Sequence, residues 1–467
     1  MSETYKRLFA KLQPVEQQQL LAFWDGLDEA GQSRLAEQID AIDFEQLAEL
    51  FTHRDDVADL AAILAQAKSP PGLKMGDAAG EISPEAAWAA GAEAIATGEV
   101  GVVIVAGGQG TRLGFDAPKG TFPIGPVTDR TLFQIHVEKV LARSRRHGAR
   151  IPLYIMTSPA THEATVAFFD ENHRFGLPAD DLIIFCQGTM PAVDMRTGEV
   201  LLSGKDQIAL SPDGHGGMVA ALQRSGALAD MDRRGIKYLY YLQVDNPLID
   251  VAGEEYLGYH VLTDSELSSQ VVRKQDPMER VGNVVQVGES LQIVKYSDLP
   301  DDVANRREPD GELSIWAGSI AVHVFSVELL RRMLSQAGAM PFHIAKKKVA
   351  HLTADGTRVE PTEPNAIKFE RFIFDVLPHA KRPLVVEIDP AEGFAPLKNA
   401  PGAATDTPEY VREMLSAWYV DRLRRLGREV ADGTILEVSP LLALDETELA
   451  DRVPADGKLE GEVCLGP

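Results

Sequence analysis

The segment that most constrains the fold is a short apolar run followed at once by a glycine-rich turn. Residues 103–122 read VIVAGGQGTRLGFDAPKGTF. The continuously apolar, β-branched run Val102–Val105 is typical of a strand that is buried on both faces of a sheet. Gly107, Gly108 and Gly110 follow it, and because they lack side chains their backbone N–H groups can approach a polyphosphate closely. The segment therefore predicts a buried strand that leads into an anion-binding loop.

Two cations lie in the same loop. Arg112 and Lys119 can neutralise the phosphates that the glycines approach, although a glycine-rich turn with two solvated cations has the same sequence pattern. The dinucleotide-binding fingerprint is excluded, because it needs a glycine three residues after Gly110, where this chain has Leu113. A Walker loop is also excluded, because it ends in Gly-Lys-Ser or Gly-Lys-Thr, whereas the order here is Lys-Gly-Thr.

Compact apolar runs alternate with helical patterns through the middle of the chain. This alternation predicts an α/β fold with a doubly wound mixed sheet that is covered on both faces and joined by right-handed crossovers. An antiparallel hairpin at 284–296, with a Gly-Glu-Ser turn, is expected on the same sheet. The expected strands are 102–105, 153–156, 182–186, 238–244, 270–272, 320–325 and 384–388, and the expected helices are 133–142, 160–169, 218–228 and 327–334.

The two ends of the chain differ from this middle part. Apolar residues recur at helical spacing from Val15 to about Phe51, a Pro- and Gly-rich linker covers Lys68–Pro84, and Ser83 with Pro84 predicts the cap of a helix that continues to Ala96. After residue 390 the sequence becomes rich in Pro, Gly and Ala before a last helix near 408–426. We therefore expect a helical N-terminal region with its linker at 1–96, a catalytic α/β domain at 97–390 and a small C-terminal region at 391–467.

Charge and cysteine content exclude several classes of protein. The 467 residues carry a formal net charge of −24, which argues against nucleic acid or an anionic membrane as a partner. No apolar run reaches the roughly 18–20 residues that span a membrane, and the first residues lack the pattern of a secretory signal. Cys186 and Cys464 alone cannot form a disulfide framework, so a reducing, cytoplasmic location is expected.

Several blocks of sequence, spread in order along the chain, resemble the uridylyltransferase (UDP-sugar pyrophosphorylase) family. They are most similar to its UDP-N-acetylhexosamine pyrophosphorylase branch. The resemblance covers nearly the whole chain and begins in the helical lead-in FWDGLDEAGQSRLAEQIDAIDFEQL. The blocks are AGGQGTRLG…PKG at 106–120, QGTMPA at 187–192, SPDGHGG at 211–217, VDNPL at 244–248, PFHIAKKK at 341–348, IKFERFIFD at 367–375 and FAPLKNA at 394–400.

The resemblance implies a Rossmann-like nucleotidyltransferase fold and a reaction in which UTP and a sugar 1-phosphate, with Mg²⁺, give a UDP-sugar and pyrophosphate. It assigns Gly107 and Gly108 to the nucleotide, and Arg112 and Lys119 to its triphosphate. It also assigns two residues to the uracil edge, Gln187 and Gly214. A glutamine amide, with one donor group and one acceptor, complements a pyrimidine imide. Gly214 lies in a turn-forming Pro-Asp-Gly.

Asp245 ends the predicted strand 238–244, and ligands of open α/β sheets bind beyond the carboxyl ends of the strands. An aspartate at such a place is more often a cap or a turn former, but beside a phosphate-binding loop it predicts a Mg²⁺ ligand. Asn246 is expected to orient the ribose or the waters of the metal. The resemblance makes Lys398 a catalytic phosphate ligand together with Arg112 and Lys119, with Lys368 as a weaker candidate.

Three predicted sugar-binding positions depart from the hexosamine branch. His215 stands where that branch has Asn, Lys295 where it has Glu, and Ser319 where it has Asn. Each change alters a hydrogen-bonding group that faces the sugar, so N-acetylglucosamine 1-phosphate, glucose 1-phosphate and galactose 1-phosphate all stay open. A nucleotidyltransferase for another nucleoside triphosphate is the main alternative, and a non-catalytic sensor of nucleotide sugars is a weaker one. The sequence does not decide whether the chain forms homo-oligomers.

Overall fold

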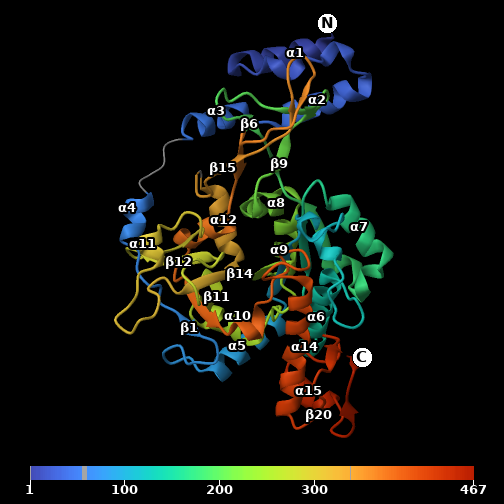
Figure 1. Ribbon diagram of the computed structural model, residues 1–467, viewed down its shortest axis with the longest axis vertical. Helices are drawn as coiled ribbons and strands as arrows, with labels where there is room; N and C mark the ends of the chain where they lie inside the picture. Colours follow the sequence, from blue (N-terminus) through green and yellow to red (C-terminus); the bar gives the residue numbers. More distant parts are fainter. Residues whose placement is uncertain (1, 55–59, 337, 467) are drawn as a thin grey trace. The chain divides into compact units, whose positions relative to one another are not determined.

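A computed structural model describes residues 2–54, 60–336 and 338–466 (Figure 1). The chain folds into two compact units, each made of three segments, and each is described here by itself. Unit 1 comprises Met1–Leu60, Gln187–Met218 and Met340–Asp375, and unit 2 comprises Ala61–Cys186, Val219–Ala339 and Val376–Pro467. The sequence boundaries expected near 96 and 390 stay predictions. Among the described residues, no helix has the length and apolar character needed to cross a membrane.

Within the described residues, unit 2 is built on a mixed sheet of ten strands. This sheet, with the helices around it in Figure 1, confirms the predicted doubly wound fold. β2, β3, β4 and β10 run parallel, and β14 runs antiparallel to both β10 and β11. The predicted hairpin forms from β12 (Gly282–Val287) and β13 (Ser290–Val294), and β12 joins the sheet beside β14. The main path across the sheet is β1 (Leu73–Lys74), β19 (Leu384–Ile388), β11 (Leu267–Arg273), β14 (Ala317–Ser326), β10 (Tyr238–Gln243), β2 (Val100–Val105), β3 (Leu153–Thr157) and β4 (Leu182–Cys186).

The order of the strands reverses at β2. The chain passes from β2 to β3 and β4 on one side and later returns to β10 on the other side. The pairing of β2 with β10 runs in register up to Val105 opposite Gln243. The segments that follow these two strands therefore leave the same edge of the sheet, at the kind of switch point where open α/β sheets bind ligands.

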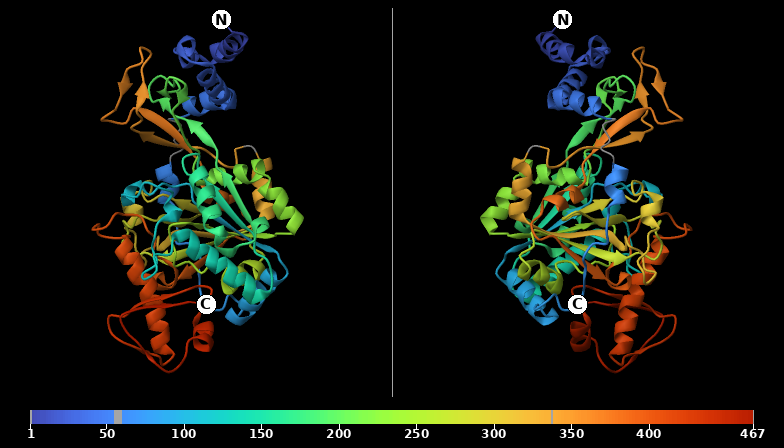
Figure 2. Two further views of the ribbon diagram at one scale, coloured as in Figure 1. Left: turned by 90° about the vertical axis from the view of Figure 1, so that its right-hand side faces the viewer. Right: turned by 90° about the vertical axis from the view of Figure 1, so that its left-hand side faces the viewer.

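Helices cover both faces of this sheet (Figure 2). On one face, apolar side chains of α5 (Pro84–Ala96), α6 (Leu132–His147), α7 (His162–Glu171), α10 (Glu254–Leu262) and α14 (Pro408–Arg425) share a core with the strands. On the other face, α9 (Ala227–Arg234) contacts β3 through a 2.9 Å hydrogen bond from the Tyr154 hydroxyl to Asp230. The helix expected at 218–228 is in fact two helices, α8 (Met218–Arg224) and α9, because Gly226 adopts a φ of 79° between them.

The crossing of α5 and α10 depends on two glycines. A Cβ atom at Gly91 would lie 1.8 Å from the carbonyl oxygen of Glu254, and one at Gly258 would lie 1.5 Å from that of Ala87. The backbones of the two helices are therefore in direct contact. As predicted, Ser83 caps α5 and accepts a hydrogen bond from the backbone N–H of Ala86.

The C-terminal residues of unit 2 form a small region of their own after α14. Strand β20 (Glu429–Val430) pairs in parallel with β22 (Lys458–Leu459), and β21 (Ile435–Val438) with β23 (Glu462–Leu465), beside α15 (Glu446–Arg452). Leu423, Leu436 and Leu449 lie in its core. Glu437 accepts 2.7 Å hydrogen bonds from the N–H groups of Val127 and Thr128, and so attaches this region to the loop that precedes α6.

Unit 1 combines the predicted N-terminal helices with small antiparallel sheets. Its helices are α1 (Glu3–Leu12), which the sequence did not predict, α2 (Glu29–Ala41) and α3 (Phe44–Thr52). Their apolar faces pack on Ile367 and Phe369 of β18 (Ala366–Glu370). Strand β18 lies between β15 (His343–Lys347) and β6 (Val193–Asp194), and a second sheet has the order β17 (Arg358–Val359), β16 (His351–Leu352), β7 (Leu202–Gly204) and β8 (Gln207–Ile208).

Candidate functional site

The glycine-rich loop leaves the sheet directly after β2. The Gly107 carbonyl accepts a 2.7 Å hydrogen bond from the Ser158 hydroxyl, which lies just after the neighbouring strand β3. The Gly108 carbonyl accepts from the backbone N–H of Lys119 at 3.0 Å, and this bond closes the loop. Among the described residues other than Gly108 and its two chain neighbours, no heavy atom lies within 4 Å of the position that a Cβ would take at Gly108. The loop is therefore fixed by its own backbone and leaves space beside Gly108 for a ligand.

Lys119 and Asp245 meet at the switch point of the sheet. The Lys119 ammonium lies 3.4 Å from Asp245 Oδ2 and donates to the Leu397 carbonyl at 3.1 Å. The Asp245 carbonyl in turn accepts from the N–H of Leu397 at 2.8 Å. The side chains of Lys119 and Asp245 are 18% and 14% exposed, so the pair is partly shielded but reachable from outside. The structure thus brings together Lys119, Asp245 and the segment that carries Lys398.

Arg112 and Lys398 complete the set of predicted cations. Arg112 is exposed in the short 3-10 helix Thr111–Leu113, and its guanidinium forms no ion pair with the residues that the structure describes. The ammonium of Lys398 lies 5.8 Å from the centre of the Phe394 ring, within the range of a cation–π contact. Both cations belong to unit 2, as do Lys119 and Asp245.

Asp406 lies beside Lys398, and the sequence did not indicate this position. Its carbonyl accepts hydrogen bonds from the N–H groups of Lys398 at 2.9 Å and Asn399 at 3.0 Å. Burial raises the pKa of its carboxyl, the charge of Lys398 lowers that pKa in part, and the negative charge of Asp245 raises it again. The Asp406 carboxyl therefore lies near both residues. Asp406 has a φ of 57°, in the left-handed region that residues other than glycine seldom adopt. The surrounding sequence Thr-Asp-Thr-Pro does not indicate that this aspartate lies beside Lys398.

The donor set at this place suits a hard divalent cation. Magnesium takes oxygen ligands and is usually held by one or two carboxylates plus waters and substrate phosphates, rather than by a protein cage. Asp245 supplies one carboxylate, and the charge of Asp245 reaches the Asp406 carboxyl, whose pKa it raises. Within residues 2–54, 60–336 and 338–466, no group of three or more His, Cys, Asp or Glu side chains forms such a cage. The residues present therefore fit a metal that is held largely by substrate oxygens.

Asn246 does not have the position that the sequence suggested. Its side chain is 2% exposed and points into the protein. Its Nδ2 donates to the Gly393 carbonyl at 2.8 Å, and its Oδ1 accepts from the N–H groups of Ala395 and Leu248 at 3.1 and 3.3 Å. The expectation that Asn246 orients the ribose or a metal-bound water is therefore wrong, because its polar atoms are engaged by the backbone.

Two of the predicted sugar-binding residues lie around Gly282 in unit 2. Gly282 pairs with Ser319 of β14, and Lys295 follows β13, whose Val294 pairs with Asn283. The pairing of β14 with β11 is irregular near Ser319, and Ala321 has a φ of 58°. Such bulges commonly redirect side chains beside functional sites. The strand register thus places Lys295 and Ser319 on either side of one glycine.

The remaining predicted residues belong to unit 1. Gln187 is 9% exposed, and Gly214 has a φ of 84° and no room for a side chain, since a Cβ there would lie 2.3 Å from the Arg371 carbonyl oxygen. His215 Nδ1 accepts a hydrogen bond from the backbone N–H of Ile373 at 3.2 Å, so this ring nitrogen carries no hydrogen in that contact. Lys368 lies on β18, opposite Ala345. That these residues share a ligand with the glycine-rich loop stays a prediction.

An aromatic pair beside His215 was not predicted. The rings of Phe372 and Phe374 are stacked, with centres 5.0 Å apart and planes at 9°. The centre of the His215 ring lies 5.3 Å from that of Phe372 and 5.8 Å from that of Phe374. The two phenylalanines alternate along the sequence FIF, a pattern that also suits an ordinary core segment, so the pattern alone does not single them out.

Comparison with known proteins identifies the family. Residues 74–405 match the family described as UTP–glucose-1-phosphate uridylyltransferase. The chain is 40% identical over 365 residues to the UDP-N-acetylglucosamine pyrophosphorylase of Saccharomyces cerevisiae, a match that covers 76% of each protein. It is 36% identical over 439 residues to the UDP-N-acetylhexosamine pyrophosphorylase-like protein 1 of Xenopus tropicalis, covering 90% of this chain and 84% of that protein.

A solved structure agrees with these matches. The uridine diphosphate N-acetylglucosamine pyrophosphorylase of Trypanosoma brucei superposes with a TM-score of 0.81 at 25% identity, over 97% of this chain and 95% of that one. The family match covers well over half of this chain and includes the glycine-rich loop, Lys119, Asp245 and Lys398. The chain therefore belongs to the UTP–glucose-1-phosphate uridylyltransferase family, and it is a nucleotidyltransferase that acts on UTP and a sugar 1-phosphate.

Proposed function

We propose that this chain transfers the uridylyl group of UTP to N-acetylglucosamine 1-phosphate with the help of Mg²⁺ and releases pyrophosphate. The observation that carries the proposal is the pair of Lys119 and Asp245, 3.4 Å apart, directly beside the glycine-rich loop. A cation and a carboxylate at the switch point of an α/β sheet are suited to a triphosphate and its metal. The choice of sugar is supported by the names of the yeast and frog relatives.

The reaction needs no nucleophile from the protein. An anionic oxygen of the sugar phosphate attacks the α-phosphorus of UTP and forms a new P–O bond, while the bond from the α-phosphorus to the bridging oxygen breaks and its electron pair leaves with pyrophosphate. Because the attacking oxygen is already charged, no side chain has to remove a proton. Catalysis then depends on positioning the two substrates and on offsetting the charge that moves to the leaving group.

The side chains divide this work. In the proposal, the backbone at Gly107 and Gly108 lies along the nucleotide, while Arg112 and Lys119 offset charge on the triphosphate. Lys398, which lies in the segment 394–400, also offsets charge on the phosphate groups. The carbonyl contacts of Lys119 to Leu397 keep its ammonium directed toward Asp245.

Enzymes of this family use a divalent metal, and Asp245, with Asp406 near it, would hold Mg²⁺ here. When bound, the ion would neutralise phosphate charge and polarise the transferred group. Asp245 is 14% exposed, so its carboxylate can reach an ion that is held mainly by substrate. The Mg²⁺ concentration that gives the half-maximal rate should therefore be higher in Asp245→Asn than in wild type. This substitution keeps the shape of the side chain but removes its charge.

In unit 1, Gln187 and Gly214 are proposed to read the uracil, and His215 to lie near the sugar. Lys295 and Ser319 of unit 2 are proposed to contact the sugar as well. A second candidate substrate is glucose 1-phosphate or galactose 1-phosphate, because all three sugar positions differ from the hexosamine pattern. A hydrogen-bonding group that faces the wrong substituent can discriminate strongly between sugars.

One panel of assays decides between these candidates. Pyrophosphate release is measured with UTP and, in turn, N-acetylglucosamine, glucose and galactose 1-phosphates, and then with ATP, CTP, GTP or dTTP in place of UTP. We expect the highest kcat/KM with UTP and N-acetylglucosamine 1-phosphate. A higher kcat/KM with a hexose 1-phosphate would replace the proposed sugar, and a preference for another nucleotide would reject uridylyl transfer.

The site is tested by a matched pair of lysine variants. Lys119→Met removes the ammonium beside Asp245, whereas Lys237→Met removes one at the opposite end of β10, in an exposed pair with Glu99. We expect a large loss of kcat only in Lys119→Met, with both variants folded by circular dichroism. Equal rates in the two variants would mean that the Lys119 ammonium has no part in the reaction.

A further inference from the structure

Asn246 binds the segment that leads to Lys398. It directly follows Asp245, and its amide donates to the Gly393 carbonyl at 2.8 Å and accepts from the N–H of Ala395 at 3.1 Å. It therefore holds both neighbours of Phe394 in the chain. The side chain is 2% exposed, so water does not compete for these bonds.

Phe394 in turn lies under the ammonium of Lys398. The distance from Lys398 Nζ to the ring centre is 5.8 Å, and a ring face attracts a cation at this distance. A long lysine side chain has many rotamers, and fixing it costs conformational entropy. Because Asn246 bonds the residues on both sides of Phe394, the Phe394 ring is fixed in place. Its contact with Lys398 then reduces the number of positions that the ammonium takes.

The same segment is tied to Asp245 by a separate bond. The N–H of Leu397, next to Lys398, donates to the Asp245 carbonyl at 2.8 Å. Lys398 is thus linked to the turn after β10 at two points, through Leu397 and through Phe394. One is a bond between main chains, which substitution of a side chain does not remove, and the other depends on the amide of Asn246.

We propose that Asn246 is a positioning residue: by bonding Gly393 and Ala395 it fixes the Phe394 ring beneath the Lys398 ammonium and holds that cation at a set place relative to Asp245. The proposal rests on the proposed role of Lys398 as a phosphate ligand. Asn246 itself touches no substrate, because its polar atoms face the protein. Its effect on the reaction should therefore pass entirely through Lys398.

This role differs from a purely structural one in a measurable way. Loss of the Asn246 amide leaves a buried carbonyl and a buried N–H without partners, which lowers stability under either view. Only a positioning role predicts that the effect on kcat depends on whether Lys398 is present. Two residues that act through one another give non-additive effects in a double-mutant cycle, whereas independent ones multiply.

The test is a cycle of wild type, Asn246→Ala, Lys398→Ala and the double variant. The value of kcat is measured with saturating UTP and sugar 1-phosphate, at a temperature well below the Tm of every variant. We expect Asn246→Ala to lower kcat about tenfold or more in the wild-type background, since small displacements of a positioning group are costly. In the Lys398→Ala background we expect the same substitution to lower kcat by less than about twofold.

Two further variants separate an effect on kcat from an effect on stability. Asn246→Asp retains an oxygen for the Ala395 N–H, but its charged form cannot donate to Gly393 and is buried beside that carbonyl, so it should lower both kcat and the Tm. Ser416→Ala serves as the control, because the Ser416 hydroxyl also makes a buried bond, accepting at 2.8 Å from the N–H of Leu436 on β21 of the small C-terminal region. We expect Ser416→Ala to lower the Tm and leave kcat unchanged.

The outcomes separate the two hypotheses. A tenfold effect of Asn246→Ala that persists in the Lys398→Ala background would overturn the positioning role while leaving the proposed function intact. Wild-type kcat in both Asn246 variants would also overturn it. If Lys398→Ala alone keeps wild-type kcat, the proposed role of Lys398 fails first, and the positioning role fails with it.

Discussion

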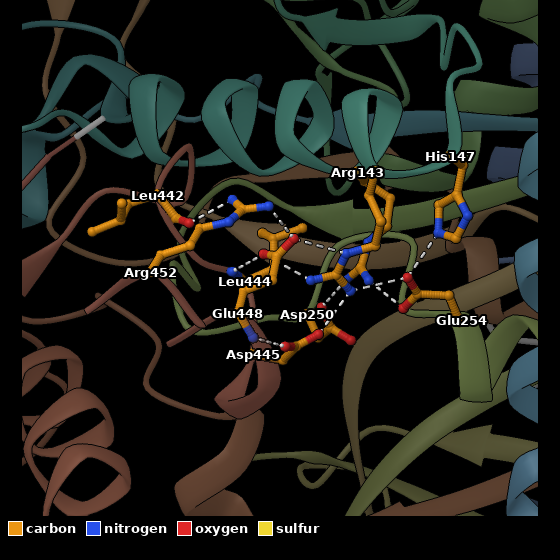
Figure 3. A network of polar contacts seen from close by, with 10 residues as sticks. Arg143, His147, Asp250, Glu254, Leu442, Leu444, Asp445, Glu448 and Arg452 are labelled. Atoms are coloured by element: carbon orange, nitrogen blue, oxygen red, sulfur yellow. Dashed lines mark hydrogen bonds and ion pairs between the residues drawn. The ribbon is translucent and has the colours of Figure 1, made fainter. Parts of the chain in front are cut away.

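Substitution of Glu254 by Gln should destabilise unit 2 strongly at neutral pH. Glu254, at the start of α10, is 4% exposed and accepts hydrogen bonds from three side chains of α6 (Figure 3). Arg143 is one of these donors, Arg146 contacts the carboxylate at 3.1 Å, and His147 at 2.8 Å. Arg143 also pairs with Asp250, in the turn that follows the candidate metal ligand. Glutamine keeps the size of this side chain, removes its charge and replaces one of the two acceptor oxygens with an NH₂ donor.

The magnitude follows from the pKa of Glu254. Burial alone would raise that pKa, but the charge of Arg143 and the hydrogen bonds from His147 and Arg143 outweigh it and lower the pKa from 4.5 to about 2. At about 1.4 kcal/mol per pKa unit, this difference stabilises the folded state by about 3 kcal/mol at pH 7. Breaking a buried ion pair by removing one partner costs about 3–5 kcal/mol, which is consistent.

The dependence on pH gives the prediction a second check. A carboxyl whose pKa is lowered on folding contributes its full stabilisation above pH 4.5, and the contribution is lost as pH falls toward 2. The difference in unfolding free energy between wild type and Glu254→Gln should therefore be about 3 kcal/mol at pH 7 and about half of that at pH 3. The control is Glu99→Gln, because Glu99 forms an exposed pair with Lys237. This substitution should change the free energy of unfolding by less than about 1 kcal/mol.

Urea unfolding followed by circular dichroism at the two pH values measures these differences. A loss below about 1 kcal/mol at pH 7 would mean that the network in Figure 3 contributes little net stability, as is common for ion pairs that water reaches. An equal loss at pH 7 and pH 3 would mean that the charge of Glu254 is not the cause. Either result would contradict the predicted contribution of the Glu254 charge to the stability of unit 2.

Three further predictions concern the site, the helix crossing and acid stability. Lys119→Met should lower kcat about 100-fold or more in the pyrophosphate-release assay, because the cation beside Asp245 is lost; a loss below tenfold would contradict its role. Gly258→Ala should lower the unfolding free energy by about 3 kcal/mol or more, because its Cβ would lie 1.5 Å from the Ala87 carbonyl oxygen; an unchanged urea midpoint would show that α5 and α10 can separate at no cost. Burial lowers the pKa of His260 from 6.5 to about 3, so this residue alone should cost the folded state about 2 kcal/mol as pH falls from 6.5 to 5. His260→Gln should remove that part of the pH dependence in urea titrations, and an identical slope in the variant would show that the imidazole is charged inside the fold.

The sequence predicted best where a local pattern and a buried surface require the same structure. The run before the glycine-rich loop had to be a buried strand, and the alternation of apolar runs with helical patterns had to form a covered sheet. Each of these strands is present, and Asp245 and Lys119 meet as expected because parallel strands end at one edge. The split of the helix at Gly226 is a single-residue effect that the periodicity did not reveal.

Contacts between distant segments could not be predicted in this way. Asp406 lies near Asp245 and Lys398 only because the chain after α13 (Pro390–Gly393) returns to the turn after β10. Asn246 looked like a ligand-facing residue because it follows Asp245, yet its bonds to residues near 393 turn it inward. Unit 1 likewise combines three segments that are far apart in the sequence. Such arrangements depend on tertiary packing, for which a single sequence gives no local signal.

We expect the chain to move the uridylyl group of UTP to the phosphate of N-acetylglucosamine 1-phosphate at the site of Lys119 and Asp245. The most direct measurement uses UTP that is radiolabelled at the α-phosphorus and follows the label by chromatography in wild type and in Lys119→Met. We predict that the label appears in UDP-N-acetylglucosamine with unlabelled pyrophosphate, and that the rate falls about 100-fold in the variant. Label in pyrophosphate or in free phosphate, or equal rates in the two proteins, would contradict uridylyl transfer at this site.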